Sequence, residues 1–163
     1  MAGGAIVDRD FVPGLLFEIK LLLSQSSVKS GDARAALKFG DEALAAATRM
    51  NNARTIALAQ LARANALLEG GEPKKGLDLA LEVQRSFATG GQYVSEWQAW
   101  RTAALASRRL RDEAKAAEYG LAAKAALSRL EQQWNTENYK NYLSRPDVQH
   151  GLRQLDEVQA SKN

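Results

Sequence analysis

The sequence predicts an all-α protein built from about three stacked antiparallel helical hairpins. Three observations predict it: helical patterns run along nearly the whole chain, stretches typical of β-strands are almost absent, and the helical pattern repeats at an offset of 40 residues. With 163 residues, 45% of them hydrophobic and 25% charged, the chain has the size and composition of one globular domain. Because one hairpin cannot bury its apolar face alone, we expect the hairpins to stack.

The repeat is clearest in the turns between helices. The stretches "SGDARAA" at 30–36, "GGEPKKG" at 70–76 and "LRDEAKA" at 110–116 fall in register when the chain is shifted by 40 residues. Each supplies an acid where a helix N-terminus needs an acceptor for its free N–H groups, namely Asp32, Glu72 and Asp112. Pro73 then stands in a first turn, where its missing N–H costs nothing.

Small residues recur at fixed positions inside these helices. The matching sets are Ala36, Gly76 and Ala116; Gly40, Ala80 and Gly120; Ala43, Val83 and Ala123; and, in the preceding helices, Ser24, Ala64 and Ala104. Large apolar side chains flank them at Phe39, Leu79 and Tyr119. A glycine inside a helix costs up to about 1 kcal/mol relative to alanine, so we expect Gly40 and Gly120 to mark the closest helix–helix contacts. The alternative is that these glycines are hinges, although a hinge has no reason to recur in phase.

The expected helices follow in order from these signals. The first hairpin combines 12–29, opened by Asp10 and Pro13, with 32–51. After the Asn51-Asn52 turn the second combines 53–69 with 73–88, and after the Gly90-Gly91 turn the third combines 92–109 with 112–133. The apolar run at 15–23 is interrupted by Glu18 and Lys20, so we interpret it as a buried helix face and not as a membrane segment.

The segment after the third hairpin leaves the repeat. Large residues at helical spacing predict a short helix that acts as a lid over the last hairpin; they are Trp134, Tyr139, Tyr142 and Leu143. Pro146 is expected to end this helix, and Asp147 to cap a final one at 148–159.

The hairpin pattern resembles the tetratricopeptide repeat, in which aromatic and small residues recur in each helical pair. The third repeat matches best, through Trp100, Ala104, Ala116, Tyr119-Gly120 and Ala123, and the first matches through Gly31, Ala36, Phe39-Gly40 and Ala43. The second departs from the pattern, with Gln60 at the aromatic position and Gly76 in place of alanine. The period is longer than the typical unit of about 34 residues, and the proline that normally ends each unit is missing. In this the chain is similar to the long-helix arrays of bacterial transcription activators and signalling proteins.

The resemblance implies a right-handed superhelix with a concave groove, lined by the first helix of each hairpin, that binds a segment of another protein. On this basis the chain divides into a lead-in at 1–12, a repeat domain at 13–134 (units 13–51, 53–88 and 92–134) and capping helices at 135–160. Transferred by phase, the partner-binding positions are Gln25, Leu61, Asn65, Leu68, Gln98, Arg101, Leu105 and Arg108. Glu18, Leu21, Val28 and Leu58 share the same face.

Asn65, Arg101 and Arg108 suit a peptide carboxylate or an acidic side chain, because an amide binds peptide groups and a guanidinium offers a rigid fork of donors. The leucines suit apolar anchors of the partner, or else they bury against a neighbouring hairpin or a second copy of the chain. A tail folded into the groove would make the same residues part of a core.

Other functional classes find little support in the sequence. Positive and negative residues are interleaved and the formal net charge is only +3, which disfavours nucleic-acid binding; the arginines at 101, 108, 109 and 111 are its one motivation. With no cysteine and His150 as the single histidine, we assign no catalytic residue, metal or cofactor, and expect no enzymatic activity. "GGEPKKG" lacks the ending of a phosphate-binding loop. Asp8, Arg9 and Asp10 interrupt any signal-peptide core, so we expect a cytoplasmic location and no membrane contact.

The leading hypothesis is therefore a non-catalytic protein–protein interaction module that binds a partner segment in its groove. The second is self-association, as a homodimer or as an assembly or sensor segment of a larger bacterial regulator, through exposed leucines.

Overall fold

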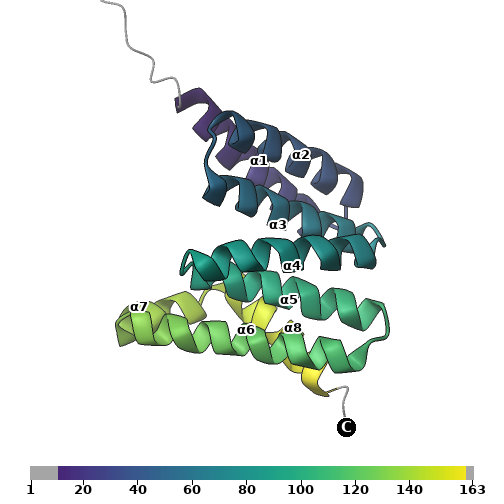
Figure 1. The fold of residues 1–163 in the computed structure, drawn as a ribbon, viewed down its shortest axis with the longest axis vertical. Coiled ribbons are helices and arrows are strands. Elements are labelled where there is room, and N and C mark those ends of the chain that lie inside the picture. Colours follow the sequence, from purple (N-terminus) through teal and green to yellow (C-terminus); the bar gives the residue numbers. More distant parts are fainter. Residues whose placement is uncertain (1–10, 161–163) are drawn as a thin grey trace, which may run out of the picture.

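The computed structural model describes residues 11–160, which form eight α-helices joined by short turns (Figure 1). In chain order they are α1 (Phe11–Lys29), α2 (Ala33–Arg49), α3 (Ala53–Glu69), α4 (Pro73–Thr89), α5 (Tyr93–Arg109), α6 (Glu113–Gln133), α7 (Thr136–Leu143) and α8 (Pro146–Ala160). Successive helices pack in antiparallel pairs, and α1 also packs on α3, and α3 on α5. The all-α prediction is confirmed, and the expected helix ranges agree with these bounds to within two residues.

The five turns of the array share one backbone form. A residue with positive φ lies at every twentieth position: Gly31 (77°), Asn51 (50°), Gly71 (77°), Gly91 (62°) and Arg111 (61°). After four of these residues, all except Asn51, the next N–H bonds to the carbonyl five residues back, as from Asp32 to Ser27 at 2.9 Å. This is the Schellman arrangement, which satisfies the last carbonyls of a helix. A 17-residue helix and a three-residue turn therefore form a unit of 20, and two units give the repeat of 40.

Side-chain caps explain where some of these helices begin. Asp32 accepts a hydrogen bond from the N–H of Ala35 at 2.9 Å, and Asp112 accepts one from Lys115 at 3.0 Å, as predicted. Glu72 occupies the equivalent position, but its side chain caps nothing, because its carboxylate pairs with Lys75.

One expected helix signal, in the tail, is wrong, and another, at the start of the chain, is not tested. Pro146 opens α8 and Asp147 lies in its first turn, so the prediction that Asp147 caps this helix is wrong. Proline suits a first turn because it has no N–H to leave unpaired. Asp10, expected to open the first helix, lies outside the described residues.

The small-residue stripe is buried, but the closest approach is not where we expected it. A Cβ added at Gly76 would lie 3.0 Å from the Ala64 carbonyl oxygen and 3.3 Å from the Leu68 nitrogen, so α3 and α4 meet at backbone distance. At Gly40 the nearest atom would be Cγ of Arg63 at 2.9 Å, which confirms a close contact there. At Gly120 nothing would lie within 3.6 Å, because the nearest atom, in the Gln159 side chain, would be 3.7 Å away; the prediction for Gly120 is wrong.

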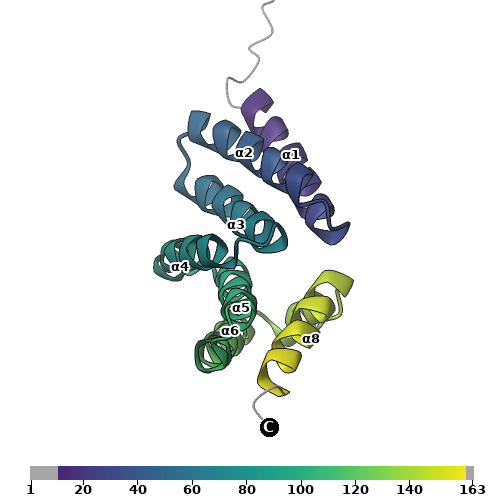
Figure 2. The same ribbon diagram turned by 90° about the vertical axis from the view of Figure 1, so that its right-hand side faces the viewer.

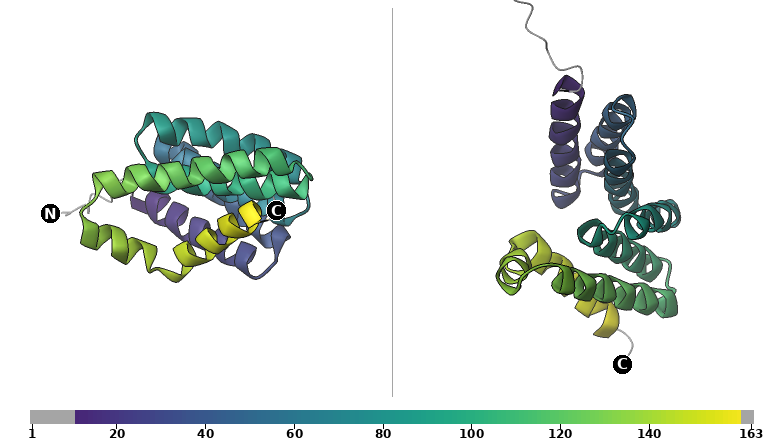
Figure 3. Two further views of the ribbon diagram at one scale, coloured as in Figure 1. Left: turned by 90° about the horizontal axis from the view of Figure 1, so that it is seen from below. Right: turned by 60° about the vertical axis from the view of Figure 1, so that its left-hand side comes forward.

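The core is a series of clusters between successive helices. At the N-terminal end it consists of Phe17 and four alanines, whereas at the C-terminal end it contains Trp97, Leu130 and Leu155. Figure 2 shows that α8 returns to the side of the array on which α1 lies, and the right-hand view of Figure 3 shows the same arrangement. Within residues 11–160 no helix is long and apolar enough to cross a membrane.

Candidate functional site

The two C-terminal helices cover part of the predicted binding surface on α5. The indole N–H of Trp97 donates a hydrogen bond to the Tyr142 hydroxyl at 2.6 Å, and Gln98 also hydrogen-bonds this hydroxyl. From α8, Gly151 faces Trp97 and Arg101 so closely that an added Cβ would lie 2.9 Å from the indole ring and 2.8 Å from the guanidinium. Burial raises the pKa of the Tyr142 hydroxyl, which these hydrogen bonds partly offset. Gln98 is thus already engaged by the protein's own tail.

Arg101 is the most unusual charged group of this surface. Its guanidinium stacks on Trp97 at 5.7 Å from the ring centroid, and its Nε is buried without a hydrogen-bond partner. The guanidinium makes no ion pair within residues 11–160; Asp147 acts on it only at longer range. Burial lowers its pKa, but an arginine side chain stays charged in proteins. The surface therefore carries a partly desolvated positive charge that no carboxylate of residues 11–160 pairs with directly.

Asn65 is a neighbour of this surface, and both polar atoms of its amide already make a hydrogen bond. Its Nδ2 donates to the Leu61 carbonyl at 3.1 Å, and its Oδ1 accepts from the Thr102 hydroxyl at 2.8 Å. Thr102 is fully buried, and its bond to Asn65 ties α5 to α3. Each polar atom of the Asn65 amide already has one partner, which leaves one N–H and one lone pair of the amide for any further bond.

The remaining predicted positions divide into buried and accessible ones. Leu61 and Leu68 are only 5% exposed and pack between hairpins, which leaves them almost no surface for a partner in this conformation. Leu105 is half-buried against the C-terminal core cluster. Gln25 on α1 is exposed, and Arg108 is partly exposed without an ion pair in the described part of the chain. Arg101 and Arg108 are thus the predicted cations that the structure leaves without a carboxylate partner.

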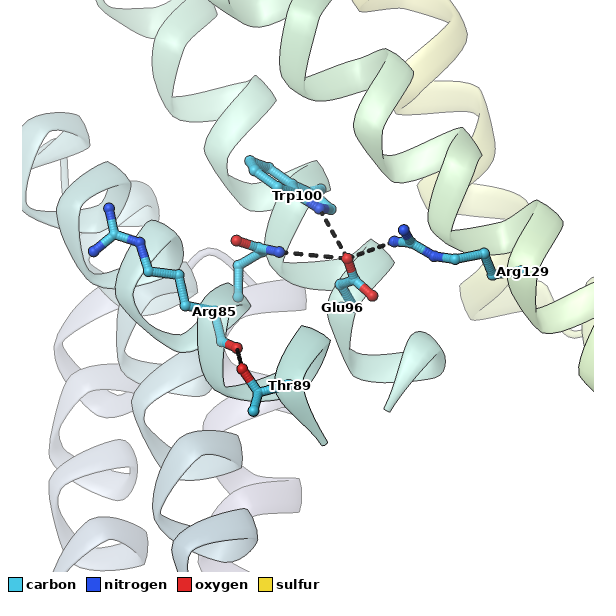
Figure 4. Close-up of polar contacts among 6 residues, drawn as sticks. Arg85, Thr89, Glu96, Trp100 and Arg129 are labelled. Carbon is cyan, nitrogen blue, oxygen red and sulfur yellow. Dashed lines mark hydrogen bonds and ion pairs between the residues drawn. The ribbon is translucent and has the colours of Figure 1, made fainter. Parts of the chain in front are cut away.

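A buried glutamate that accepts hydrogen bonds from three side chains, and that the sequence analysis did not predict, lies on the first turn of α5 (Figure 4). Glu96 is 2% exposed, and its Oε1 accepts from Arg129 at 2.6 Å, from Gln84 at 3.3 Å and from the Trp100 indole at 3.4 Å. These donors come from α4, α5 and α6, so the carboxylate ties three helices together. Its Oε2 is buried and unpartnered. The one signal for it in the sequence is that Glu96 stands in a part of the helix that is rich in large apolar residues.

Two open depressions adjoin at the end of α6 and share Gln133 and Trp134. The larger one, about 570 Å³, is lined mainly by amides and aromatic rings of the α6–α7 corner, and the smaller, about 290 Å³, lies between the starts of α3 and α5. The sequence signal for the larger one was the run of amides in "QQWNTENYKN", which we interpreted only as a lid. No carboxylate lines either depression. Amide side chains donate and accept, so these surfaces suit polar ligands without selecting one class.

Within residues 11–160 no three acidic or histidine side chains come together in a way that could hold a metal ion. No known family model and no curated protein matches the sequence.

Proposed function

We propose that this chain is a non-catalytic protein–protein interaction module, a short tetratricopeptide-like superhelix that binds an acidic segment of a partner protein. The antiparallel helical pairs with a 40-residue repeat support the architecture. The single observation that carries the choice of partner is the guanidinium of Arg101, which is partly desolvated and has no counter-ion in the described residues. A carboxylate of a partner would supply the missing charge-assisted hydrogen bonds.

The position of α8 sets the route by which such a segment could bind. Gly151 of α8 already lies against Arg101 and Trp97. A bound segment therefore either runs beside α8 towards Arg108 or displaces α8. In both cases the positive groups that would hold the carboxylate are Arg101 and, about two turns further along α5, Arg108.

The test is selection from a random peptide library with free C-termini, using the wild-type chain and the double variant Arg101→Gln/Arg108→Gln. We expect the wild type to enrich acidic or carboxylate-terminated peptides and the variant to lose at least about tenfold in affinity for them, as loss of a charge-assisted bond implies.

The matched control is Arg34→Gln/Arg85→Gln, which removes the same charge from exposed positions on α2 and α4. Binding of the selected peptides should survive in this control. If wild type and both variants enrich the same peptides equally, the assignment to the α5 arginines is wrong.

A further inference from the structure

The largest uncovered apolar surface among the described residues lies on α1. Its members are Val12, Leu15, Ile19, Leu22 and Leu23, which are 39% to 63% exposed. We call these five side chains the α1 stripe. Other large apolar side chains that are exposed in the described chain are Leu110, in the turn after α5, and Leu121 on α6, and each stands singly.

The α1 stripe is a second face of a helix that already has a core face. Phe17 and Ser24 are buried against α2 and α3, and at 100° per residue the stripe lies on the opposite side of the helix. A helix that is apolar on both sides is typical of one buried on both sides. Single exposed leucines are ordinary, but a continuous stripe over three turns marks an interaction surface.

The polarity of the rest of the protein's surface indicates which part of a second copy could pack on the α1 stripe. At the other end of the array (Figure 1), most exposed side chains of α8 are polar, among them Gln149, His150, Arg153 and Asp156. Head-to-tail stacking of copies would therefore place apolar residues against charged ones. Among residues 11–160 of a second copy, only α1 offers a matching apolar surface.

We propose that two copies of this chain associate through the α1 stripe in a two-fold, antiparallel helix pair. The stripe spans about 17 Å of helix, and its spacing of three and four residues fits helix-on-helix packing. In the symmetric register Val12 lies against Leu22 of the second copy, and Leu15 against Ile19. Such a contact is isologous, since the same patch serves both copies.

The size of the stripe also predicts the strength of the association. A stable dimer buries roughly 800 Å² on each copy, whereas apolar patches of this kind reach about 300–600 Å². The polar neighbours Glu18, Gln25 and Ser26, which are exposed, would form the rim. We therefore expect a concentration-dependent dimer. This surface is separate from Arg101 and Arg108, so the inference does not depend on the proposed peptide binding.

The first test is sedimentation equilibrium of the full chain over a wide concentration range. Leu22→Glu places a carboxylate against Val12 at each end of the contact, so both copies bury one, and we expect it to weaken dimerisation at least about 100-fold. Leu121→Glu is the matched control, because Leu121 on α6 is 62% exposed and Leu22 is 63% exposed. The proposal is overturned by a strict monomer, by a dimer that Leu22→Glu leaves intact, or by equal weakening in both variants.

The second test uses the absence of cysteine from the sequence to determine the orientation. A mixture of Val12→Cys and Leu22→Cys chains should form a disulfide-linked heterodimer on mild oxidation. Val12→Cys alone should not, because in the antiparallel register its two copies stand about 15 Å apart along the helix axes. Efficient cross-linking of Val12→Cys to itself would contradict the antiparallel pair.

Discussion

At the scale of single residues, two buried glycines, which stand one helical turn apart in the 40-residue repeat, have opposite surroundings. A methyl group at Gly76 would meet two backbone atoms of α3, at 3.0 and 3.3 Å, which can yield only if α3 and α4 move apart. At Gly120 the nearest atoms, 3.7 Å and farther, belong to the flexible Gln159 side chain and to Val158 of α8. Each position is inside a helix, where alanine is intrinsically favoured by up to about 1 kcal/mol.

We therefore predict opposite effects of the same substitution. Gly120→Ala should raise the free energy of unfolding by about 0.5–1 kcal/mol, and Gly76→Ala should lower it by about 1 kcal/mol or more, because overpacking exceeds the gain in helix propensity. Urea unfolding followed by circular dichroism at one protein concentration measures both. Stabilisation of the same size by both substitutions would contradict the close packing of α4 on α3.

The sequence predicted that small residues line the helix contacts, but it could not rank them. The repeat of Gly40 and Gly120 was visible as a pattern, whereas the distance from Gly76 to the Ala64 carbonyl depends on how α3 and α4 cross. The burial of Trp97 could not be predicted from the sequence, for a similar reason. It follows from contact with Tyr142 and Gly151, about 50 residues further along the chain, which no local pattern encodes.

At the scale of helices, the turns before α4 and α6 look alike in sequence but differ in side-chain capping. Asp112 accepts a hydrogen bond from the backbone of α6, while Glu72, at the equivalent place before α4, caps nothing. Aspartate reaches the N–H groups of the first turn with its short side chain, whereas Pro73 already fixes the start of α4.

Asp112→Ala should therefore lower the free energy of unfolding by about 1 kcal/mol, the usual loss on removal of a side-chain cap. Glu72→Ala should change it by less than about 0.5 kcal/mol, since it removes only an exposed ion pair with Lys75. Thermal unfolding of both variants beside the wild type is the measurement. An equal loss in the two would show that the acid acts through its charge near the helix end and not through the hydrogen bond.

Helix order and bounds were predictable because turns and caps are local signals that recur. The 20-residue unit was not predictable from the glycines. Glycine marks the left-handed position at 31, 71 and 91, but Asn51 and Arg111 take the same conformation without a glycine to mark it. The candidate site was predictable only in part. Helix phase alone predicted Arg101 as a partner-binding residue. The same criterion also predicted Leu61 and Leu68, which are buried because α3 packs on its neighbours.

At the scale of the whole molecule, the two ends of the array have unequal cores. The fully buried residues of the cluster under α1 and α2 are Phe17 and alanines, and its other large side chains, such as Leu16, Leu21 and Leu44, are only partly buried. The cluster joining α5, α6 and α8 contains Trp97, Leu130 and Leu155, and the Glu96–Arg129 pair adds a tie between α5 and α6. In a helical array each unit touches mainly its neighbours, so stability varies along the chain.

This gradient predicts that the first hairpin opens without the rest. Phe17→Ala removes the main buried side chain beneath α1, a change that costs about 3–5 kcal/mol when a large side chain leaves a core. In native-state hydrogen exchange, the amides of α1 and α2 should then exchange nearly as fast as in the unfolded chain, while those of α5 and α6 keep their wild-type protection. Leu22→Ala, on the exposed side of the same helix, is the control and should leave α2 protected at a concentration where the chain is monomeric. If amide exchange accelerates equally in all helices of the Phe17→Ala variant, the array unfolds as one cooperative unit, and the difference between its two cores does not create independently opening parts.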